Sequence, residues 1–348
     1  MRRVSLTAAA LLATTSLANA GGIDRSGQGV NILFEEGNHA QLTFSRAMPD
    51  VTSSPIGPFP AGSDGARDFN QASFGYKHKL NDKFDLAIIV DQPYGAHISY
   101  SDGPFAGGFA DIDSTAITGL VQYHIDDNFS VHGGIRALTV EGELQTGLGL
   151  LQADSDYDFG GVVGVAYERK DIALRVALTY SSAITSDLSG TNAFFPDGFD
   201  GRNFDVEFPE SVNLDFQTGI AADTLLFGSI RWVGWDGFNL TTDEDGEWVS
   251  FDEDTVTYTL GIGRQITDQL SLAVTIGHEP DGRRPGTTAL APTNGYTSVG
   301  FGGTYQATDQ VSISGGVSYS KLGSQTISGV TFEDNDAWGA GIRLGYSF

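Results

Sequence analysis

The chain has 348 residues, a formal net charge of −25 and no cysteine. The lack of cysteine excludes a disulfide framework and a thiolate metal site, and the acidic balance argues against nucleic acid, which needs a basic face. After the N-terminal leader the sequence has no run of 18 or more apolar residues, so we expect no membrane-spanning helix.

The first twenty residues have the features of a secretory signal peptide in the right order. Arg2 and Arg3 give a positive start, residues 6–12 are apolar, and Ala18-Asn19-Ala20 fits a small-residue cleavage site. A short buried helix is the alternative, and it does not explain this order. We expect cleavage after Ala20, followed by a leader over residues 21–38.

From residue 39 onward the dominant period is two, with apolar residues alternating with small or polar ones. Side chains alternate across a strand, so each run has one apolar and one polar face. The pattern predicts fourteen strands, at 39–48, 67–80, 83–93, 111–125, 128–141, 154–169, 171–183, 204–220, 224–237, 251–266, 269–279, 295–307, 310–321 and 336–348.

Short turns that contain Asp alternate along the chain with longer segments rich in Gly, Pro and Asp. Asp favours turns because its carboxylate bonds to nearby backbone. The predicted long loops are 49–66, 94–110, 142–153, 184–203, 238–250, 280–294 and 322–335. This sidedness is typical of an outer-membrane barrel, with short periplasmic turns and long extracellular loops.

We therefore predict an all-β fold, a transmembrane antiparallel barrel of about fourteen strands over residues 39–348. Aromatic residues near the strand ends, and alternation up to the terminal Phe348, favour it over a large soluble β-sandwich or propeller. A terminal aromatic in this pattern is the signal that barrel-assembly machinery reads. We expect a monomer in the outer membrane, in contact with lipid and with lipopolysaccharide, whose surface divalent cations can bridge to acidic loops.

The parity of the strands places a set of charged residues on the face opposite the lipid. Arg136, Arg175 and Arg231 are the cations of interest, because they would bind a carboxylate or phosphate head group by charge-assisted hydrogen bonds. The alternative is that these arginines form interior salt bridges. In that case their partners would be Asp85, Asp91 and Asp215.

Nothing in the sequence predicts catalysis, a metal site or a cofactor. The six histidines lack metal-ligand spacing, and the acidic run 243–247 does not meet the spacing of a calcium-binding loop. His97, Ser99 and Asp102 are the nearest approach to a catalytic trio, and such a trio arises by chance in a polar loop. We expect a protein that is not an enzyme.

Three segments resemble the FadL-type outer-membrane transporters of long-chain fatty acids and other hydrophobic compounds. They are residues 178–184 with 188–190, residues 209–219 with 225–238, and Asp91-Gln92-Pro93-Tyr94-Gly95. The resemblance implies a barrel plugged by a small N-terminal hatch. It also implies that a hydrophobic ligand is caught by outer loops, enters a pocket at the hatch, and leaves sideways at a kinked third strand into the lipid.

The sequence departs from the family in its leader. Residues 21–38 are shorter than the usual hatch, and residues 35–40 stand where the family carries Asn-Pro-Ala, so the hatch is expected to be reduced. Pro93 and Gly95 are suited to interrupt the third strand, because Pro removes a ladder donor and Gly weakens pairing. A simple strand end beside a loop is the alternative for Pro93.

Two groups of apolar residues are candidates for ligand contact. Leu33 and Phe34 in the leader would line the inner pocket. Phe194, Phe195 and Phe199 in the predicted loop 184–203 would form a first capture site, or else pack against neighbouring loops.

The sequence thus favours a passive channel for long-chain fatty acids or related hydrophobic molecules. One rival is a general porin or small-solute diffusion channel, which would need an open, wet lumen. The other is a structural or adhesive surface protein that acts through its acidic loops.

Overall fold

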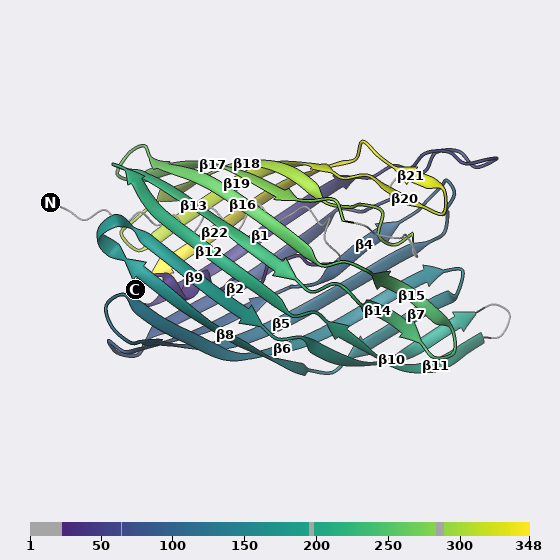
Figure 1. Cartoon of the computed structure of the whole chain (residues 1–348), viewed down its shortest axis with the longest axis horizontal. Coiled ribbons are helices and arrows are strands. Elements are labelled where there is room, and N and C mark those ends of the chain that lie inside the picture. The colour runs from purple at the N-terminus through teal and green to yellow at the C-terminus, as the bar shows by residue number, and fades with distance from the viewer. Residues whose placement is uncertain (1–22, 64, 195–197, 283–288) are drawn as a thin grey trace.

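The computed structural model describes residues 23–63, 65–194, 198–282 and 289–348. Eighteen strands form one antiparallel sheet that closes into a barrel (Figure 1). Ten strands cross the wall without interruption: β1 (His39–Asp50), β2 (Phe69–Lys79), β5 (Phe109–His124), β6 (Phe129–Thr146), β13 (Thr224–Val233), β16 (Thr255–Gln265), β17 (Leu270–Glu279), β18 (Tyr296–Gln306), β19 (Val311–Leu322) and β22 (Asp336–Ser347).

The other eight strands are the two halves of four interrupted staves of the wall. They are β3 (Phe84–Asp91) with β4 (Gly95–Ser99), β7 (Gly149–Ser155) with β8 (Asp158–Arg169), β9 (Leu174–Ser181) with β10 (Ile184–Phe194), and β11 (Gly198–Phe208) with β12 (Ser211–Ala221). The wall therefore has fourteen staves, and the predicted fourteen-stranded antiparallel barrel is confirmed.

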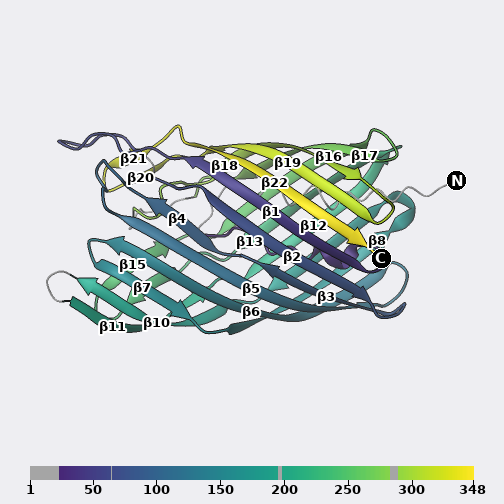
Figure 2. The same cartoon turned by 180° about the vertical axis from the view of Figure 1, so that it is seen from behind.

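The first and last strands close the barrel. β1 pairs with β22 from His39 opposite Ser347 to Asp50 opposite Asp336, and the two strands lie side by side in Figure 2. The backbone N–H of Phe348 donates to the carbonyl of Asn38 across 3.1 Å. The end of the barrel that holds Phe348 carries the short turns and is called the turn end; the opposite end is called the loop end.

Two segments predicted as loops are strands instead. The predicted loop 142–153 contains the end of β6 and most of β7, and the predicted loop 184–203 contains β10 and part of β11. Their Gly, Ser and Asp content resembles a loop because these hairpins continue beyond the part of the wall with an apolar outer face, where polar residues are tolerated on both faces. Two further hairpins cap the loop end, β14 (Phe238–Thr242) with β15 (Gly246–Phe251) and β20 (Gln325–Ile327) with β21 (Val330–Phe332).

The facing of the strands follows the predicted parity. On β6, the side chain of Ile135 is on the outside and 63% exposed, whereas that of Arg136 is inside and 5% exposed. The other interior charges predicted from parity include residues that are also buried, namely Lys77, Asp85, Asp91, His132, Arg175, Asp215 and Arg231. An apolar outer face with charges only inside is the arrangement that a lipid environment selects.

Aromatic pairs lie on neighbouring strands near both ends of the wall. Phe129 and Tyr167 have ring centroids 4.7 Å apart at the turn end, and Tyr319 and Trp338 have centroids 5.1 Å apart at the loop end. Aromatic rings at these two levels match the interfacial girdles of membrane barrels. Among the described residues, no helix is long and apolar enough to cross a membrane.

Two separate cores fill the inside of the barrel. Near the turn end, Val30, Ile32 and Leu33 of the leader pack against Ala87, Leu120 and Val162 of the wall. Near the loop end, a larger cluster is built on Trp235 and includes Tyr94, Phe208, Phe238 and Phe251, with ring centroids 4.8 to 6.1 Å apart. Residues 23–38, called here the hatch segment, run between these cores and include the 3-10 helix η3 (Asn31–Phe34). A second 3-10 helix, η4 (Lys170–Ile172), lies in the turn between β8 and β9.

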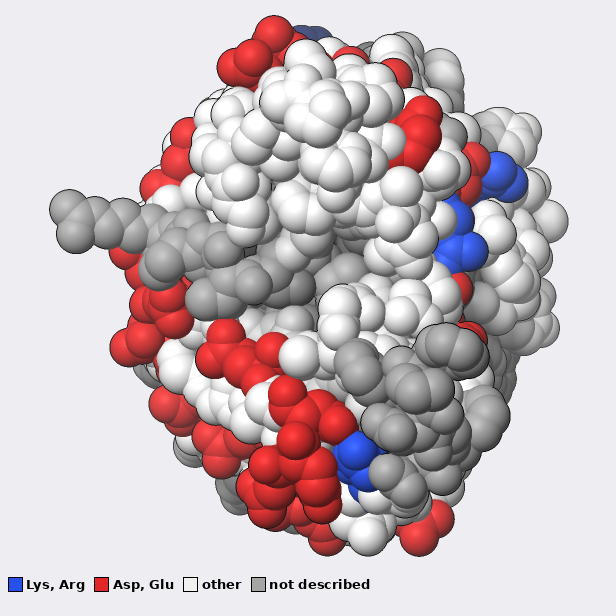
Figure 3. Space-filling view, turned by 90° about the vertical axis from the view of Figure 1, so that its right-hand side faces the viewer, with Lys and Arg blue, Asp and Glu red and all other residues white. Residues whose placement is uncertain are grey.

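Acidic side chains dominate the charged groups at the loop end. Figure 3 looks onto this end and shows many Asp and Glu side chains with few Lys or Arg. The distribution accords with the net charge of −25.

Candidate functional site

The third stave of the wall is interrupted between β3 and β4. Asp91 at the end of β3 is opposite Ala116, and Gly95 at the start of β4 is opposite Asp113, so three residues here face two on β5. This one-residue excess is a bulge, and Pro93 within it has no N–H for a ladder. Tyr94 turns inward and is 3% exposed.

The same interruption opens the contact between the second and third staves. The ladder of β2 and β3 reaches Phe74 opposite Val90. Among the described residues, the next backbone hydrogen bond between these staves runs from Arg67 to the carbonyl of His97, at 2.8 Å. The stretch between these points, residues 68–73 facing 91–96, is called here the wall break.

A single side chain bridges the wall break. Gln92 accepts a hydrogen bond from the backbone N–H of Ala72 at 3.1 Å, and its carbonyl accepts one from the Gln71 side chain at 3.3 Å. These side-chain bonds replace the backbone ladder, and a side chain can leave its position without unpairing the flanking strands.

From the inside, the hatch segment pairs with the backbone of the break. Arg25 donates to the carbonyl of Pro93 at 2.8 Å, Gly95 donates to the carbonyl of Ile23 at 2.9 Å, and Asp24 forms an antiparallel bridge with Tyr94. The hatch segment therefore supplies backbone partners at the point where the third stave leaves the sheet.

Polar side chains extend this attachment over the next hatch residues. Ser26 donates to Asp91 Oδ2 at 2.5 Å, and Gln28 donates to the Tyr94 hydroxyl at 2.9 Å. The carbonyl of Gly27 accepts a hydrogen bond of 2.8 Å from Asn213 of β12. Both the interrupted stave and the opposite wall thus hold the hatch segment.

The structure places all three predicted lumen arginines against the hatch segment. Arg231 Nε lies 2.6 Å from Asp24 Oδ2, and Arg136 Nη1 donates to Gln28 Oε1. The guanidinium of Arg175 stacks 4.6 Å above the ring of Phe34. The sequence left two roles open, a ligand head group or salt bridges to Asp85, Asp91 and Asp215; these contacts come from a third source, the hatch.

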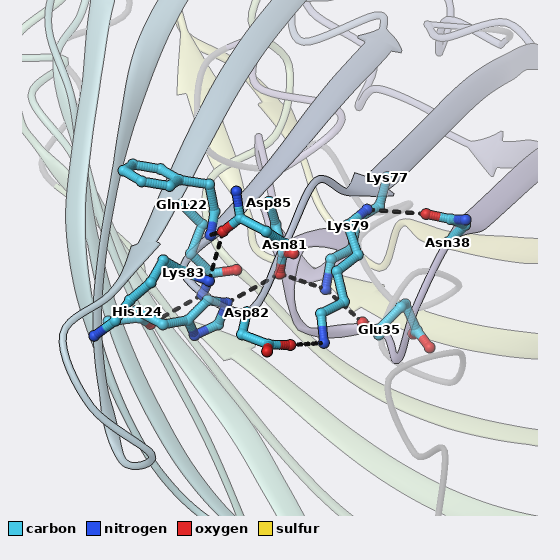
Figure 4. Close-up of polar contacts among 12 residues, drawn as sticks. Glu35, Asn38, Lys77, Lys79, Asn81, Asp82, Lys83, Asp85, Gln122 and His124 are labelled. Atoms are coloured by element: carbon cyan, nitrogen blue, oxygen red, sulfur yellow. Dashed lines mark hydrogen bonds and ion pairs between the residues drawn. The ribbon is translucent and has the colours of Figure 1, made fainter.

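The acidic residues named in that alternative have other contacts. Asp85 pairs with Lys77 of β2 at 3.0 Å and with His124 of β5 at 3.0 Å, while Asp91 accepts from Ser26. Lys77 also donates to the carbonyl of Glu35 at 2.6 Å, so it joins the end of the hatch segment to the wall (Figure 4).

Leu33 and Phe34, predicted to line a ligand pocket, lie near the turn end. Leu33 is 1% exposed in the core around the hatch segment. Phe34 packs on that core and meets His132 edge-on, with ring centroids 6.3 Å apart. A ligand that reached Leu33 would have to displace hatch residues from the wall.

The predicted aromatic capture residues lie at the tip of the β10–β11 hairpin. The backbone pairs Phe194 with Gly198 and Ala193 with Phe199, and Phe195 is outside the described residues. Arg202 of β11 binds Asp245 between β14 and β15, with Nε–Oδ2 and Nη2–Oδ1 distances of 2.7 and 2.9 Å. This fork joins two outer hairpins.

An apolar cavity of about 80 Å³ lies on the loop side of the wall break. Its lining includes Ile23 of the hatch segment, Phe69 of β2 and Ile98 of β4. Val51, Phe251 and Leu290 contribute from the loop end. The cavity therefore borders the hatch, both sides of the break and the outer loops.

A larger, polar cavity of about 230 Å³ lies beside the hatch segment, toward β1, β13 and β16. Asp24, Arg25 and Asn31 line it from the hatch, and Gln71 and Gln92 line it from the break. Ser, Thr and further charged residues of the wall complete it. The two cavities thus adjoin the same break, one apolar and one polar, with residues 23–25 at the boundary.

Sequence reasoning found the break through Pro93 and Gly95 but missed the residues that close it. Asp24, Arg25, Ser26 and Gln28 were not singled out in the leader. The available signal was composition: the polar run Asp24 to Gln28 has no period of two, yet it stands directly before a barrel whose interior is charged.

Comparisons with known proteins agree with this architecture. A model of the outer membrane protein transport protein family (OMPP1/FadL/TodX) matches residues 39–342. None of the curated proteins matches the sequence.

Solved structures share the fold. A FadL homologue of Pseudomonas aeruginosa is 14% identical with a TM-score of 0.75, covering 97% of this chain and 96% of its own. The toluene transporter TodX of Pseudomonas putida is 12% identical with a TM-score of 0.66, and coverage is 94% and 95%. The CymD monoaromatic hydrocarbon channel is 12% identical with a TM-score of 0.63, and coverage is 97% and 98%. At these identities the likeness establishes the fold, and the family match, which covers most of the chain, establishes membership: the chain belongs to the OMPP1/FadL/TodX family of outer-membrane transport proteins.

Proposed function

We propose that this protein is a passive outer-membrane channel that takes up long-chain fatty acids or related hydrophobic compounds and releases them sideways into the membrane. The observation that carries the proposal is the wall break, which lies beside an apolar cavity and is closed from within by the hatch segment. An apolar solute that left through the wall would avoid re-solvation, which disfavours it by about 0.8 kcal/mol per CH₂.

The proposed route begins at the outer loops and leads to the apolar cavity. Phe194, Phe195 and Phe199, at or next to the tip of the β10–β11 hairpin, are candidates for first contact. From the cavity the ligand would pass the break when Ile23 and Gln92 move aside, because both border the opening and neither belongs to the barrel ladder.

The printed names of the structural neighbours support a hydrophobic cargo without naming one for this chain. One neighbour is a toluene transporter and another a monoaromatic hydrocarbon channel. Leu33 and Phe34 remain candidates for an inner contact that forms once the hatch segment shifts. In this proposal Arg136, Arg175 and Arg231 hold the hatch and contact a head group only after releasing it.

The filling of the lumen disfavours the rival of a general porin. A porin needs a continuous wet path, whereas here the hatch segment and the aromatic cluster around Trp235 occupy the two halves of the barrel. No specific observation supports the rival of a structural or adhesive protein.

Uptake and conductance measurements test the proposal together. Cells that lack their own outer-membrane uptake of fatty acids would express this chain and be given a labelled long-chain fatty acid, and the purified chain would be placed in a planar bilayer. We expect labelled fatty acid to enter the cells and no steady open-channel current to appear. Steady ion current without fatty-acid uptake would overturn the proposal in favour of the porin.

A further inference from the structure

Arg25 is a buried cation at the boundary between the two cavities. It is 3% exposed, and its guanidinium carbon lies 4.0 Å from the centre of the Phe69 ring. On another side it lies against Gly95, where an added Cβ would come within 2.5 Å of the guanidinium. Phe69 and Gly95 both line the apolar cavity, and Arg25 itself lines the polar one.

The hydrogen-bonding capacity of Arg25 is largely unused. Its Nη1 lies 3.6 Å from Asp113 Oδ1, which is longer than the 2.7–2.9 Å of a charge-assisted hydrogen bond. Its Nε and Nη2 are buried and have no hydrogen-bond partner among the residues that the structure describes. A buried charged donor without a partner is costly, so this arrangement needs a reason.

The pattern of free donors distinguishes Arg25 from the other interior arginines. Arg175 and Arg231 each leave one buried nitrogen without a partner, Nε in the first and Nη2 in the second. Only in Arg25, among the described arginines with such an atom, are both nitrogens of one edge free. Nε and Nη2 form a planar fork whose spacing matches the two oxygens of a carboxylate.

We propose that Arg25 binds the carboxylate of an acidic amphiphile on its Nε–Nη2 edge while the apolar tail occupies the cavity lined by Ile23, Phe69 and Ile98. The channel then favours ionised, long-chain acids over neutral hydrocarbons of the same length. This inference rests on the proposed function and deepens it by assigning the head-group contact.

The position of Arg25 also couples recognition to opening. Its backbone N–H bonds to Pro93, and its side chain lies over Gly95, so it touches both ends of the interruption in the third stave. A carboxylate drawn to Arg25 would lie beside the wall break, with its tail already in the adjoining apolar cavity. The acidic groups Asp111 and Asp113 near the rim oppose the anion and limit how long it stays.

The test compares lauric acid with 1-dodecanol, which has the same chain length and no charge. Binding of each would be measured by calorimetry to the purified full chain in lipid nanodiscs, for the wild type and for Arg25→Gln, Arg25→Lys and Arg46→Gln. Arg46 is a matched control because its side chain is 53% exposed and pairs with Asp68, away from the cavities.

We expect Arg25→Gln to weaken laurate binding by about 10- to 100-fold, the range of a lost charged hydrogen-bond pair, and dodecanol binding by less than about 2-fold. Arg25→Lys should recover only part of the loss because an ammonium lacks the fork, and Arg46→Gln should change neither ligand. Equal weakening of both ligands by Arg25→Gln, or no weakening of laurate, would overturn the role of Arg25. If the wild type bound neither ligand, the proposed function would fail with it, so the two failures are distinguishable.

Discussion

Asp24 of the hatch segment and Arg231 of β13 form an ion pair across the lumen, with 2.6 Å between Oδ2 and Nε. Both side chains are mostly buried, at 15% and 9% exposure. The pair joins the residue that bridges to Tyr94 at the wall break to the opposite side of the barrel. The closed position of the hatch segment therefore depends on a contact remote from the break itself.

Asp24→Asn should loosen the hatch segment without unfolding the barrel. Removing one partner of a buried pair costs up to about 3–5 kcal/mol, because the other charge is left without compensation. Faster hydrogen exchange over residues 23–35, with unchanged exchange in the wall strands, is the expected result.

The matched control for this change is Arg46→Gln. Arg46 and Asp68 lie 2.7 Å apart, but both are about half exposed, and such pairs contribute about 0–1 kcal/mol. Equal exchange of residues 23–35 in Asp24→Asn and in the wild type would show that the pair does not hold the hatch segment.

Gly95→Ala should displace the Arg25 side chain. The new Cβ would come within 2.5 Å of the guanidinium, which must then leave its place over Gly95. We expect weaker laurate binding with little change for dodecanol. Gly119→Ala is the control, because a Cβ there meets nothing within 4 Å; loss of laurate binding in the control as well would trace the effect to the barrel rather than to Arg25.

Lys77→Met should destabilise the hatch end at the turn side of the barrel. The change removes the donor to the Glu35 carbonyl and leaves the buried Asp85 with His124 alone. Heat-induced unfolding followed by gel mobility should begin at a lower temperature, and Lys77→Met with Asp85→Leu should recover part of the loss because no uncompensated charge remains.

Lys79→Met serves as the control for Lys77. Lys79 pairs with Asp82 at 3.0 Å, and the two side chains are 48% and 98% exposed (Figure 4). Its replacement should leave the unfolding temperature nearly unchanged. A double variant less stable than Lys77→Met alone would contradict the account of Lys77 as the compensating charge of Asp85.

The contact between the outer hairpins should weaken in acid. Hydrogen bonds from the Arg202 guanidinium lower the pKa of Asp245 to about 2 from an ordinary 3.8. A carboxyl whose pKa is depressed by folding stabilises the contact above its unfolded pKa, and that contribution is lost as the pH falls through the folded value. We expect proteolysis at the tips of β10–β11 and β14–β15 to rise between pH about 4 and 2.

Asp245→Asn provides the comparison for the acid effect. It should raise proteolysis of the hairpins already at neutral pH and remove most of the change between pH 4 and 2. A wild-type hairpin whose protection stayed constant down to pH 2 would contradict the role of this pair.

Much of the fold follows from the sequence because a membrane barrel repeats one local rule. Alternation places Ile135 outside and Arg136 inside, and it does so on every stave, so both strand number and facing can be predicted. The predicted loops 142–153 and 184–203 were wrong because strand pairing beyond the lipid does not require an apolar face.

The candidate site was predictable only in part. Pro93 carries a local signal, since its missing N–H breaks any ladder. The partners of Arg136 and Arg231 carry none, because Gln28 and Asp24 belong to a leader without period, and their places inside the barrel depend on contacts more than a hundred residues away in sequence. The free edge of Arg25 is likewise a product of packing against Phe69 and Gly95.

Closing the wall break by a reversible crosslink tests the central claim most directly. The register of β2 and β3, extended by two residues, places Ala72 opposite Gln92, and the natural chain has no cysteine to interfere. Ala72→Cys with Gln92→Cys would be compared with Tyr76→Cys with Ile88→Cys, a pair within the intact ladder of the same staves. We predict that oxidation of the first pair stops fatty-acid uptake by cells and reduction restores it, while the second pair transports in both states. Undiminished uptake through a barrel in which the disulfide of the first pair is verified would contradict lateral release.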